Sequence, residues 1–262
     1  PEKVKITINT DPKSNTDKIV SINGGATEMS VSPNGKEVAF VFRGEIFVTS
    51  IEGGITKRIT NTPMQERMIA FAPDGRTLYF SAERNNSWDI YKATISRKEE
   101  PYFYASTVIN EEPLIASDKE EFQPVISPDG KEIAYVEDRN TIKVFNIEKK
   151  ISRTIVPPGQ NFSYSDGDQV FEWSSDGKWL AVKSVKGNFA LSGGDILLFK
   201  TDGSDSKGID VTNSGFSEGN QKWALGGKAL TYTSDKFGKR PLAIQGSKES
   251  DIFLEFFDKD MY

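Results

Sequence analysis

The stretch Ile126-Ser127-Pro128-Asp129-Gly130-Lys131 is one of five related copies that decide the fold of this chain. Each copy begins with an apolar residue, turns on small and polar residues that end in Gly, and continues with Lys or Arg before another apolar stretch. Successive turn glycines lie 40, 55, 47 and 50 residues apart. The other four copies are Val31-Ser32-Pro33-Asn34-Gly35-Lys36, Phe71-Ala72-Pro73-Asp74-Gly75-Arg76, Trp173-Ser174-Ser175-Asp176-Gly177-Lys178 and Trp223-Ala224-Leu225-Gly226-Gly227-Lys228.

This spacing predicts a β-propeller, because one propeller blade is a four-stranded antiparallel sheet of roughly 40 to 50 residues. The turn residues suit tight hairpins. Pro presets φ, Asp or Asn bonds its own backbone, and Gly accepts a positive φ. Ordinary hairpins of a sandwich or barrel would explain one copy, but five copies at this spacing favour the propeller. We therefore expect an all-β chain whose residues 1–262 form a single β-propeller domain or part of one.

Alternating apolar residues place five blades and one additional strand on the chain. The additional strand is expected at residues 3–9, where apolar and polar residues alternate from Lys3 to Asn9. It either closes the ring by joining the last blade or belongs to a blade upstream. We favour the upstream blade, because the chain opens at Pro1 with neither an initiator Met nor a signal peptide. The expected blades cover residues 28–60, 67–117, 122–156, 169–212 and 220–257.

Composition narrows the possible partners. With 33 Lys and Arg against 38 Asp and Glu, the net charge is −5, which argues against nucleic acid as the main partner, because binding phosphate usually needs a basic patch. No apolar run approaches the roughly 18 residues that a membrane-spanning helix needs, so we expect no membrane insertion. The chain has no Cys, which rules out disulfides and thiolate zinc sites but leaves the compartment open.

The sequence contains no His either. A Ser, His, Asp triad needs an imidazole base near neutral pH, and the two-histidine metalloprotease motif is excluded as well. Ser with Lys, or paired carboxylates, remain as catalytic groups, but their spacing in this chain has no distinctive pattern. We therefore expect that this chain on its own is not an enzyme, and we assign it no catalytic residue, no metal site and no cofactor.

Several segments resemble the propeller blades of bacterial tricorn-like serine peptidases, and the resemblance covers nearly the whole chain. The first runs from Glu28 through the turn into Glu45-Ile46-Phe47-Val48 and on to Arg58-Ile59-Thr60-Asn61-Thr62-Pro63. The others are Ser163-Tyr164-Ser165-Asp166-Gly167-Asp168-Gln169, Ser234-Asp235-Lys236-Phe237-Gly238 and Gly246-Ser247-Lys248-Glu249-Ser250-Asp251-Ile252-Phe253.

In that family the propeller precedes a PDZ-like module and a protease core that holds the active-site Ser and His, and no residues of this chain match them. The resemblance implies a non-catalytic propeller that gates, filters or docks peptides for a protease core outside this chain. Its partners would be peptides or unfolded protein segments and that core. Because the segments resemble the bacterial members of the family, we favour an extracytoplasmic, periplasmic setting and leave the cytoplasm open.

The turn phrase and the Arg58-Ile59-Thr60 edge also resemble the propellers of TolB-like periplasmic proteins and of prolyl oligopeptidases. Shared blades therefore leave an alternative open. In this alternative the chain is a free-standing TolB-like propeller whose role is to hold a protein partner.

Six residues near strand ends or in a long loop are candidate contacts for a peptide or partner. Guanidinium groups can bind a carboxylate bidentately, and exposed loop aromatics suit a protein interface. Internal ion pairs and packing of the loop on its own blade are the competing interpretations. Asp166 and Asp168 could offer oxygen ligands to a cation, but they lack the other ligands of an EF-hand loop, so we favour a hydrogen-bonded turn. The six candidates are Arg43, Arg67, Arg84, Arg139, Phe162 and Tyr164.

Overall fold

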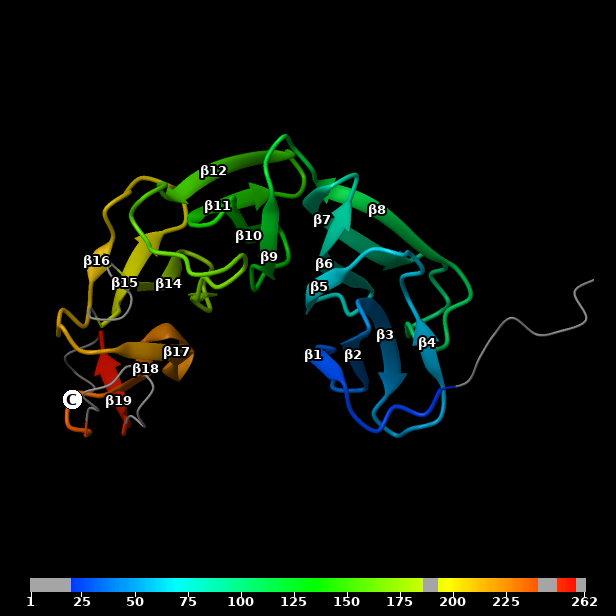
Figure 1. The fold of residues 1–262 in the computed structure, drawn as a ribbon, viewed down its shortest axis with the longest axis horizontal. Coiled ribbons are helices and arrows are strands. Elements are labelled where there is room, and N and C mark those ends of the chain that lie inside the picture. The colour runs from blue at the N-terminus through cyan, green and yellow to red at the C-terminus, as the bar shows by residue number, and fades with distance from the viewer. Residues whose placement is uncertain (1–19, 186–192, 240–248, 258–262) are drawn as a thin grey trace, which may run out of the picture.

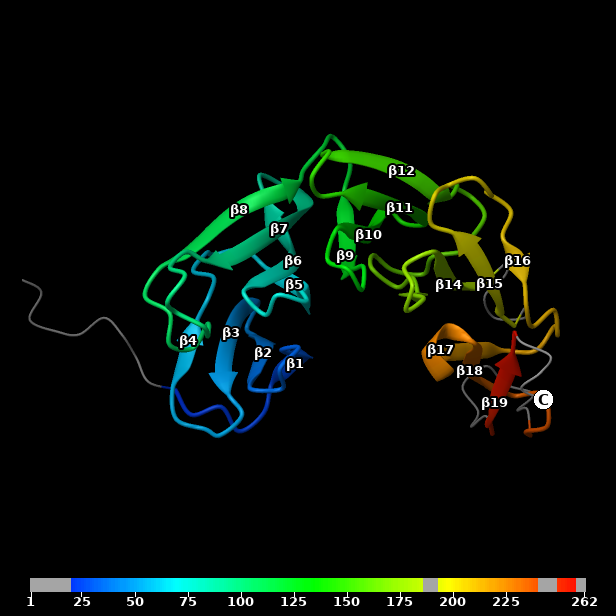
Figure 2. The same cartoon turned by 180° about the vertical axis from the view of Figure 1, so that it is seen from behind.

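The computed structural model describes residues 20–185, 193–239 and 249–257, so the strand expected at residues 3–9 lies outside the described residues. Five antiparallel sheets follow one another along an arc, with the sheet that contains β1 at one end and the sheet that contains β19 at the other (Figure 1). The view from behind shows the same arrangement (Figure 2). The prediction of an all-β propeller with four-stranded blades is confirmed.

Each blade is one sheet whose strands follow the order of the sequence. Four sheets have four strands, and the last has three within the described residues. Blades 1 and 2 consist of β1 Ala26–Val31, β2 Glu37–Phe42, β3 Glu45–Ser50 and β4 Thr56–Arg58, then β5 Glu66–Phe71, β6 Thr77–Arg84, β7 Ser87–Ile95 and β8 Ile109–Ile115. Blade 3 contains β9 Glu121–Ile126, β10 Glu132–Glu137, β11 Thr141–Asn146 and β12 Ile151–Val156. Blades 4 and 5 contain β13 Phe171–Trp173, β14 Trp179–Ser184, β15 Asp195–Lys200 and β16 Ile209–Asp210, then β17 Glu218–Ala224, β18 Ala229–Ser234 and β19 Asp251–Phe256.

Helical structure is almost absent from the described residues. It amounts to a single 3-10 turn, Leu225–Gly227, where the fifth and most altered copy of the repeated turn lies. No helix there has the length and apolar character that crossing a membrane requires.

The repeated turn is held together by the side chains of its Ser and its Asp or Asn. In blade 4, Ser174 Oγ donates to Asp176 Oδ1 (2.6 Å) and accepts from the Trp179 N–H (3.0 Å), while the Lys178 N–H donates to the same Asp176 oxygen (3.1 Å). The Ser174 hydrogen bond holds the pKa of Asp176 below its ordinary value. The same bonds recur in two other turns, through Ser32, Asn34, Lys36 and Glu37 and through Ser127, Asp129, Lys131 and Glu132.

Different hydrogen bonds hold the corresponding turn in blade 2. Ala72 replaces the serine and offers no hydroxyl. Asp74 Oδ1 therefore accepts directly from the Thr77 N–H (3.0 Å), and its second oxygen accepts from the Thr77 hydroxyl (3.1 Å). The threonine two residues after the turn glycine thus supplies the hydroxyl that the missing serine would have provided.

The apolar core lies between blades, because each sheet buries one face against the next sheet. Trp173 of blade 4 also reaches across with its indole N–H to the Val125 carbonyl of blade 3 (2.9 Å). Two clusters show the pattern most clearly. Blades 1 and 2 share Ala39, Val41, Ile46, Val48, Phe71, Leu78, Phe80, Ala82 and Phe103. Blades 3 and 4 share Phe122, Ala134, Val136, Ile142, Val144, Ile155, Phe171, Trp173, Leu180, Val182, Leu197 and Phe199.

The strand order gives the arc two distinct faces. Antiparallel strands reverse at every connection, so the repeated turns between the first and second strands all lie on one face, which we call the turn face. The connection from each blade to the next lies on the opposite face, together with the turns between second and third strands. We call this second face the connection face.

Glu37 is a buried carboxyl at the turn-face end of β2. Its Oε1 accepts from the Tyr104 N–H (3.1 Å) in the long β7–β8 connection, and its Oε2 has no hydrogen-bond partner. Burial raises the pKa of Glu37 above its ordinary value, and the backbone hydrogen bonds from Tyr104 and Phe103 oppose this shift only in part. The β7–β8 connection itself is anchored by Phe103, which is fully buried in the core between blades 1 and 2.

Replacing the turn serine of blade 4 tests the contribution of these hydrogen bonds. We expect Ser174→Ala to lower the free energy of unfolding by about 1–2 kcal/mol, because a buried N–H and a carboxylate oxygen each lose a partner. The exposed neighbour Ser175 gives a matched control, and Ser175→Ala should leave stability almost unchanged. Urea unfolding of the two variants measures both values. Equal effects of the two substitutions would contradict this account of the turn.

Glu37 should make stability depend on pH. Its pKa in the folded state is raised above the ordinary 4.5, so between these two values the folded chain holds a proton that the unfolded chain has released. The free energy of unfolding should therefore fall as pH rises above 4.5. Glu37→Gln keeps an acceptor for Tyr104 and should remove this part of the slope. Urea unfolding at several pH values measures it, with the exposed Glu52→Gln as control, and an unchanged slope in Glu37→Gln would refute the assignment.

Candidate functional site

The structure brings all six predicted contact residues to the connection face. The four arginines lie at or beside strand ends of blades 1 to 3, and the two aromatics lie in the long connection between β12 and β13. The neighbours of the six side chains differ, and these neighbours determine which side chains are available to bind a partner. The six are Arg43, Arg67, Arg84, Arg139, Phe162 and Tyr164.

Arg84 is already fully engaged inside its blade. Its guanidinium lies 2.7 Å from Glu66 and 3.1 Å from Glu111, it stacks over the Tyr91 ring at 5.3 Å, and only 14% of its side chain is exposed. Such a buried and hydrogen-bonded ion pair is structural, because removing one partner would leave an uncompensated charge. Arg84 therefore stabilises blade 2 and does not present a free guanidinium at the surface.

Arg43 and Arg67 lie nearer to solvent. Arg43 occupies the β2–β3 turn with a φ of 54° and packs over the ring of Phe42 (5.2 Å). Arg67 lies on the innermost strand of blade 2, where its Nε is 3.7 Å from Glu28 of blade 1. An exposed pair at this distance contributes little stability, so the Arg67 guanidinium is free to exchange Glu28 for another carboxylate.

Residues 157–170, between β12 and β13, form what we call the inner loop. Figure 1 shows this connection crossing the inner side of the arc between β9 and β14. Hydrogen bonds from Asn140 and Gln123 and to Gln123 join it to blade 3. Gln123 Nε2 donates to the Gln169 carbonyl (2.8 Å), and the Gln169 N–H donates to Gln123 Oε1 (3.1 Å). At its other end Asn161 is buried and accepts from the Val185 N–H (2.6 Å).

At Gly167 the inner loop contacts blade 2. A Cβ added to this glycine would lie 1.9 Å from Met68 Cε and 3.5 Å from Gln123 Cγ, and its φ of +74° is one that residues with a side chain rarely adopt. Only glycine therefore allows the loop to approach the innermost strands so closely. The loop thus contacts blades 2, 3 and 4 together.

Asp166 and Asp168 help to hold the inner loop in place. This agrees with the hydrogen-bonded turn that we favoured from the sequence. Asp168 Oδ2 accepts from the N–H groups of Tyr164 (2.5 Å) and Ser165 (2.9 Å), which makes a tight turn. Asp166 Oδ1 lies 2.9 Å from Arg139 Nε in an exposed ion pair between blade 3 and the loop. Among the described residues there is no group of three or more His, Cys, Asp or Glu that could hold a metal ion.

Tyr164 stands at the surface of this ordered loop. Its side chain is 77% exposed, and the neighbouring Phe162 is 40% exposed, although the backbone around both is fixed by hydrogen bonds. Rigid, exposed aromatics beside an exchangeable ion pair are typical of protein-binding surfaces, because little further ordering is needed on binding. We take Tyr164, Phe162, Arg139 and Asp166 as the candidate site.

Sequence reasoning named Arg139, Phe162 and Tyr164 as candidate contacts but missed the residues that position them. Gln123, Asn161 and Gln169 carry no charge, and amide side chains are too common in propeller sequences to attract attention. The one available signal was the length of the β12–β13 connection. A long loop in a compact fold usually has a function of its own.

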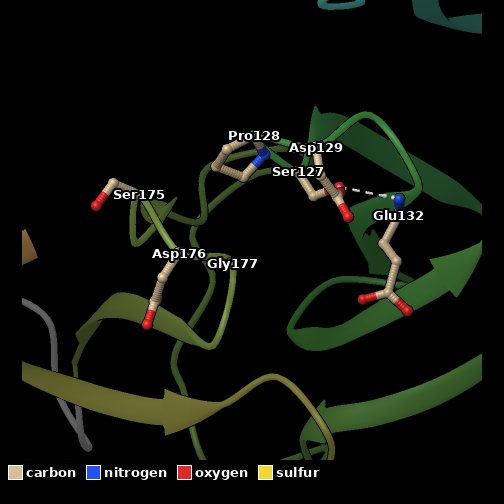
Figure 3. A pocket seen from close by; sticks show the side chains of 7 residues that line it. All are labelled: Ser127, Pro128, Asp129, Glu132, Ser175, Asp176 and Gly177. Atoms are coloured by element: carbon tan, nitrogen blue, oxygen red, sulfur yellow. Dashed lines mark hydrogen bonds between the residues drawn. The ribbon is translucent and has the colours of Figure 1, made fainter.

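A small hollow on the turn face, about 110 Å³ in volume, lies between the repeated turns of blades 3 and 4 (Figure 3). Its acidic groups are already used. Asp129 and Asp176 hold their own turns, and Glu132 forms a bidentate pair with Arg153 (2.7 and 2.6 Å). The hollow therefore contains no acidic group that is available to bind a ligand. Its lining consists of Ser127, Pro128, Asp129, Glu132, Ser175, Asp176 and Gly177.

Comparison with known proteins identifies the fold. No protein-family model and no curated protein matches the sequence. Among solved structures, a putative TolB from Agrobacterium tumefaciens matches with a TM-score of 0.57 and 15% identity over 88% of this chain and 89% of that chain. TolB from Acinetobacter baumannii matches with a TM-score of 0.53 and 17% identity over 88% and 54% of the two chains. The tricorn protease gives a TM-score of 0.59 and 14% identity over 92% of this chain but only 23% of its own. The chain therefore has the β-propeller fold found in TolB and in the propeller region of the tricorn protease.

Proposed function

We propose that this chain is a non-catalytic propeller that binds peptides or unfolded protein segments on its connection face, through the candidate site on the inner loop. The observation that carries the proposal is Tyr164, an exposed aromatic on a loop that is nevertheless anchored to three blades. The Arg139–Asp166 ion pair beside it can exchange partners with a peptide carboxylate or ammonium group, because exposed ion pairs are weak.

Within a longer protein, such a propeller would gate, filter or dock peptides for a serine-protease core outside this chain. The similarity to the tricorn protease propeller and the absence of His and Cys support this role. A bacterial, extracytoplasmic setting fits the same proposal. Peptide hydrolysis by the purified chain would contradict it.

A free-standing TolB-like interaction propeller is the second candidate. The fold match to the putative TolB from Agrobacterium tumefaciens, over 88% of this chain, supports it. The coding sequence on both sides of this chain separates the two roles. A PDZ-like segment and a core with Ser and His would support the protease role, whereas a stop codon soon after Tyr262 would support the free-standing one.

The peptide-binding surface can be tested by fluorescence anisotropy with a fluorescein-labelled, permanently unfolded protein as probe. We expect Tyr164→Ala to weaken binding about tenfold or more, the typical effect of losing a central aromatic contact. Tyr102→Ala is a matched control, because Tyr102 is also an aromatic in a long connection but lies on the turn face, stacked on Tyr104. Equal binding by the wild type and Tyr164→Ala, or a comparable loss in Tyr102→Ala, would refute the proposed surface.

A further inference from the structure

Acidic residues recur at the junctions between blades on the connection face. The innermost strands of blades 2, 3 and 5 each begin with a buried glutamate, namely Glu66, Glu121 and Glu218. In blade 4 the innermost strand lacks the bulge found in β5, β9 and β17, and the buried Gln169 takes the corresponding place. The third strand of the preceding blade carries a second acid at or near its start at three of the four junctions, as Glu45, Asp89 or Asp195, and begins with Thr141 at the remaining one.

At three junctions these positions are occupied by ion-paired acids, neutral side chains or acids that accept hydrogen bonds from serine. Between blades 1 and 2, Arg84 lies 2.7 Å from Glu66, and Arg58 Nε donates to Glu45 (2.6 Å). Between blades 3 and 4 the corresponding groups are the neutral Thr141 and Gln169.

Between blades 4 and 5, serine side chains and one backbone N–H donate to the acids. Ser214 joins them, because its N–H donates to Asp195 (3.0 Å) and its hydroxyl to Glu218 (2.6 Å). The Ser234 hydroxyl also donates to Glu218 Oε1 (2.7 Å), whereas Glu218 Oε2 has no hydrogen-bond partner.

The junction between blades 2 and 3 differs. Asp89 and Glu121 are 6% and 0% exposed, and Asp89 Oδ1 and Glu121 Oε2 have no hydrogen-bond partner. Glu121 Oε1 accepts from the Ser117 hydroxyl (2.5 Å), but no ion pair within the described residues includes either acid. Two buried carboxylates without a counter-charge are costly, so this junction favours the uptake of either a cation or a proton.

The repeat shows which cation is missing. Glu66 and Glu121 lie opposite Ala82 and Glu137 in their sheets, and two residues further along each chain come Arg84 and Arg139. Arg84 turns inward to Glu66, whereas Arg139 turns outward to Asp166 of the inner loop. The guanidinium that would neutralise Glu121 is thus used elsewhere.

We infer that Asp89 and Glu121 bind a hard divalent cation of the Ca²⁺ class at the junction between blades 2 and 3. The donor set consists only of oxygens, as such cations prefer. The two carboxylates balance the charge. The Ser117 hydroxyl donates to Glu121, and the Ser87 hydroxyl lies within hydrogen-bond reach of Asp89, so two neutral oxygens border the pair, and water would complete the shell of six to eight ligands.

Protonation is the alternative to a bound cation at this pair. Burial, with the nearby Asp89 charge as a smaller contribution, raises the pKa of Glu121 to about 7, and burial likewise raises the pKa of Asp89. A shared proton is therefore the competitor of the metal ion at this junction, and the experiment has to separate the two.

Terbium luminescence provides that experiment, because Tb³⁺ replaces Ca²⁺ and emits when a nearby Trp is excited. Trp88 precedes Asp89 and packs on Phe122 with ring centroids 5.8 Å apart, whereas the other three Trp belong to blades 4 and 5. We expect saturable emission with one Tb³⁺ per chain, displaced by Ca²⁺. The midpoint of thermal unfolding should be higher in Ca²⁺ than in EDTA.

Glu121→Gln should abolish the saturable emission and the Ca²⁺-dependent shift. This variant is expected to fold, because Gln169 occupies the corresponding place in blade 4. Trp88→Phe should lose the emission but keep the Ca²⁺-dependent shift, which places the ion beside residue 88. Asp129→Asn on the turn face is the control and should change neither.

Two results would overturn the inference. Emission that persists in Glu121→Gln would place the ion elsewhere. Absence of any Ca²⁺ effect, together with a Glu121→Gln variant that is more stable than the wild type above pH 7 in EDTA and Ca²⁺ alike, would show that the pair holds a proton instead. Neither readout involves Tyr164 or the unfolded-protein probe, so the outcome is independent of the proposed peptide-binding function.

Discussion

Each blade of this propeller is a sheet with two apolar faces, and neither face can be buried by the blade alone. Burial therefore comes from the neighbouring blades, as the mixed clusters of blades 1 with 2 and of blades 3 with 4 show. Ile46 and Val48 are fully buried in this way. Stacking of sheets by apolar contact is thus the interaction on which the rest of the structure depends, and it stabilises the arc junction by junction.

That constraint moves polar chemistry to the two ends of each junction, where strands begin and end and backbone groups need partners. On the turn face the Ser and Asp or Asn side chains satisfy these groups within the turns of blades 1, 3 and 4, and Asp74 with Thr77 does so in blade 2, so most of this face is occupied by its own hydrogen bonds. On the connection face the segments between blades differ in length, and acids and hydroxyls from two blades meet there. Binding and regulation therefore have more room on the connection face, and both proposed sites lie on it.

The sequence predicted the blade architecture well, because glycine spacing and apolar alternation are local signals repeated five times. It also selected Arg139 and Tyr164 as surface residues. It could not show that Arg84 and Arg139, at corresponding places in their blades, turn in opposite directions, because this depends on the course of the inner loop. The contact between Gly167 and Met68 joins residues almost one hundred positions apart, and no pattern in the sequence predicts it.

One residue of the candidate site, Arg139, connects it to the proposed cation site. Arg139 pairs with Asp166 in the inner loop, and by doing so it leaves Glu121 without the guanidinium that serves Glu66 in blade 2. A partner that takes Asp166 away from Arg139 would free this guanidinium to compete with a cation at the junction, whereas a bound cation would favour the present pairing. Binding free energies coupled through a shared group are reciprocal. The position of one arginine therefore determines how strongly the inner loop and the junction between blades 2 and 3 depend on each other.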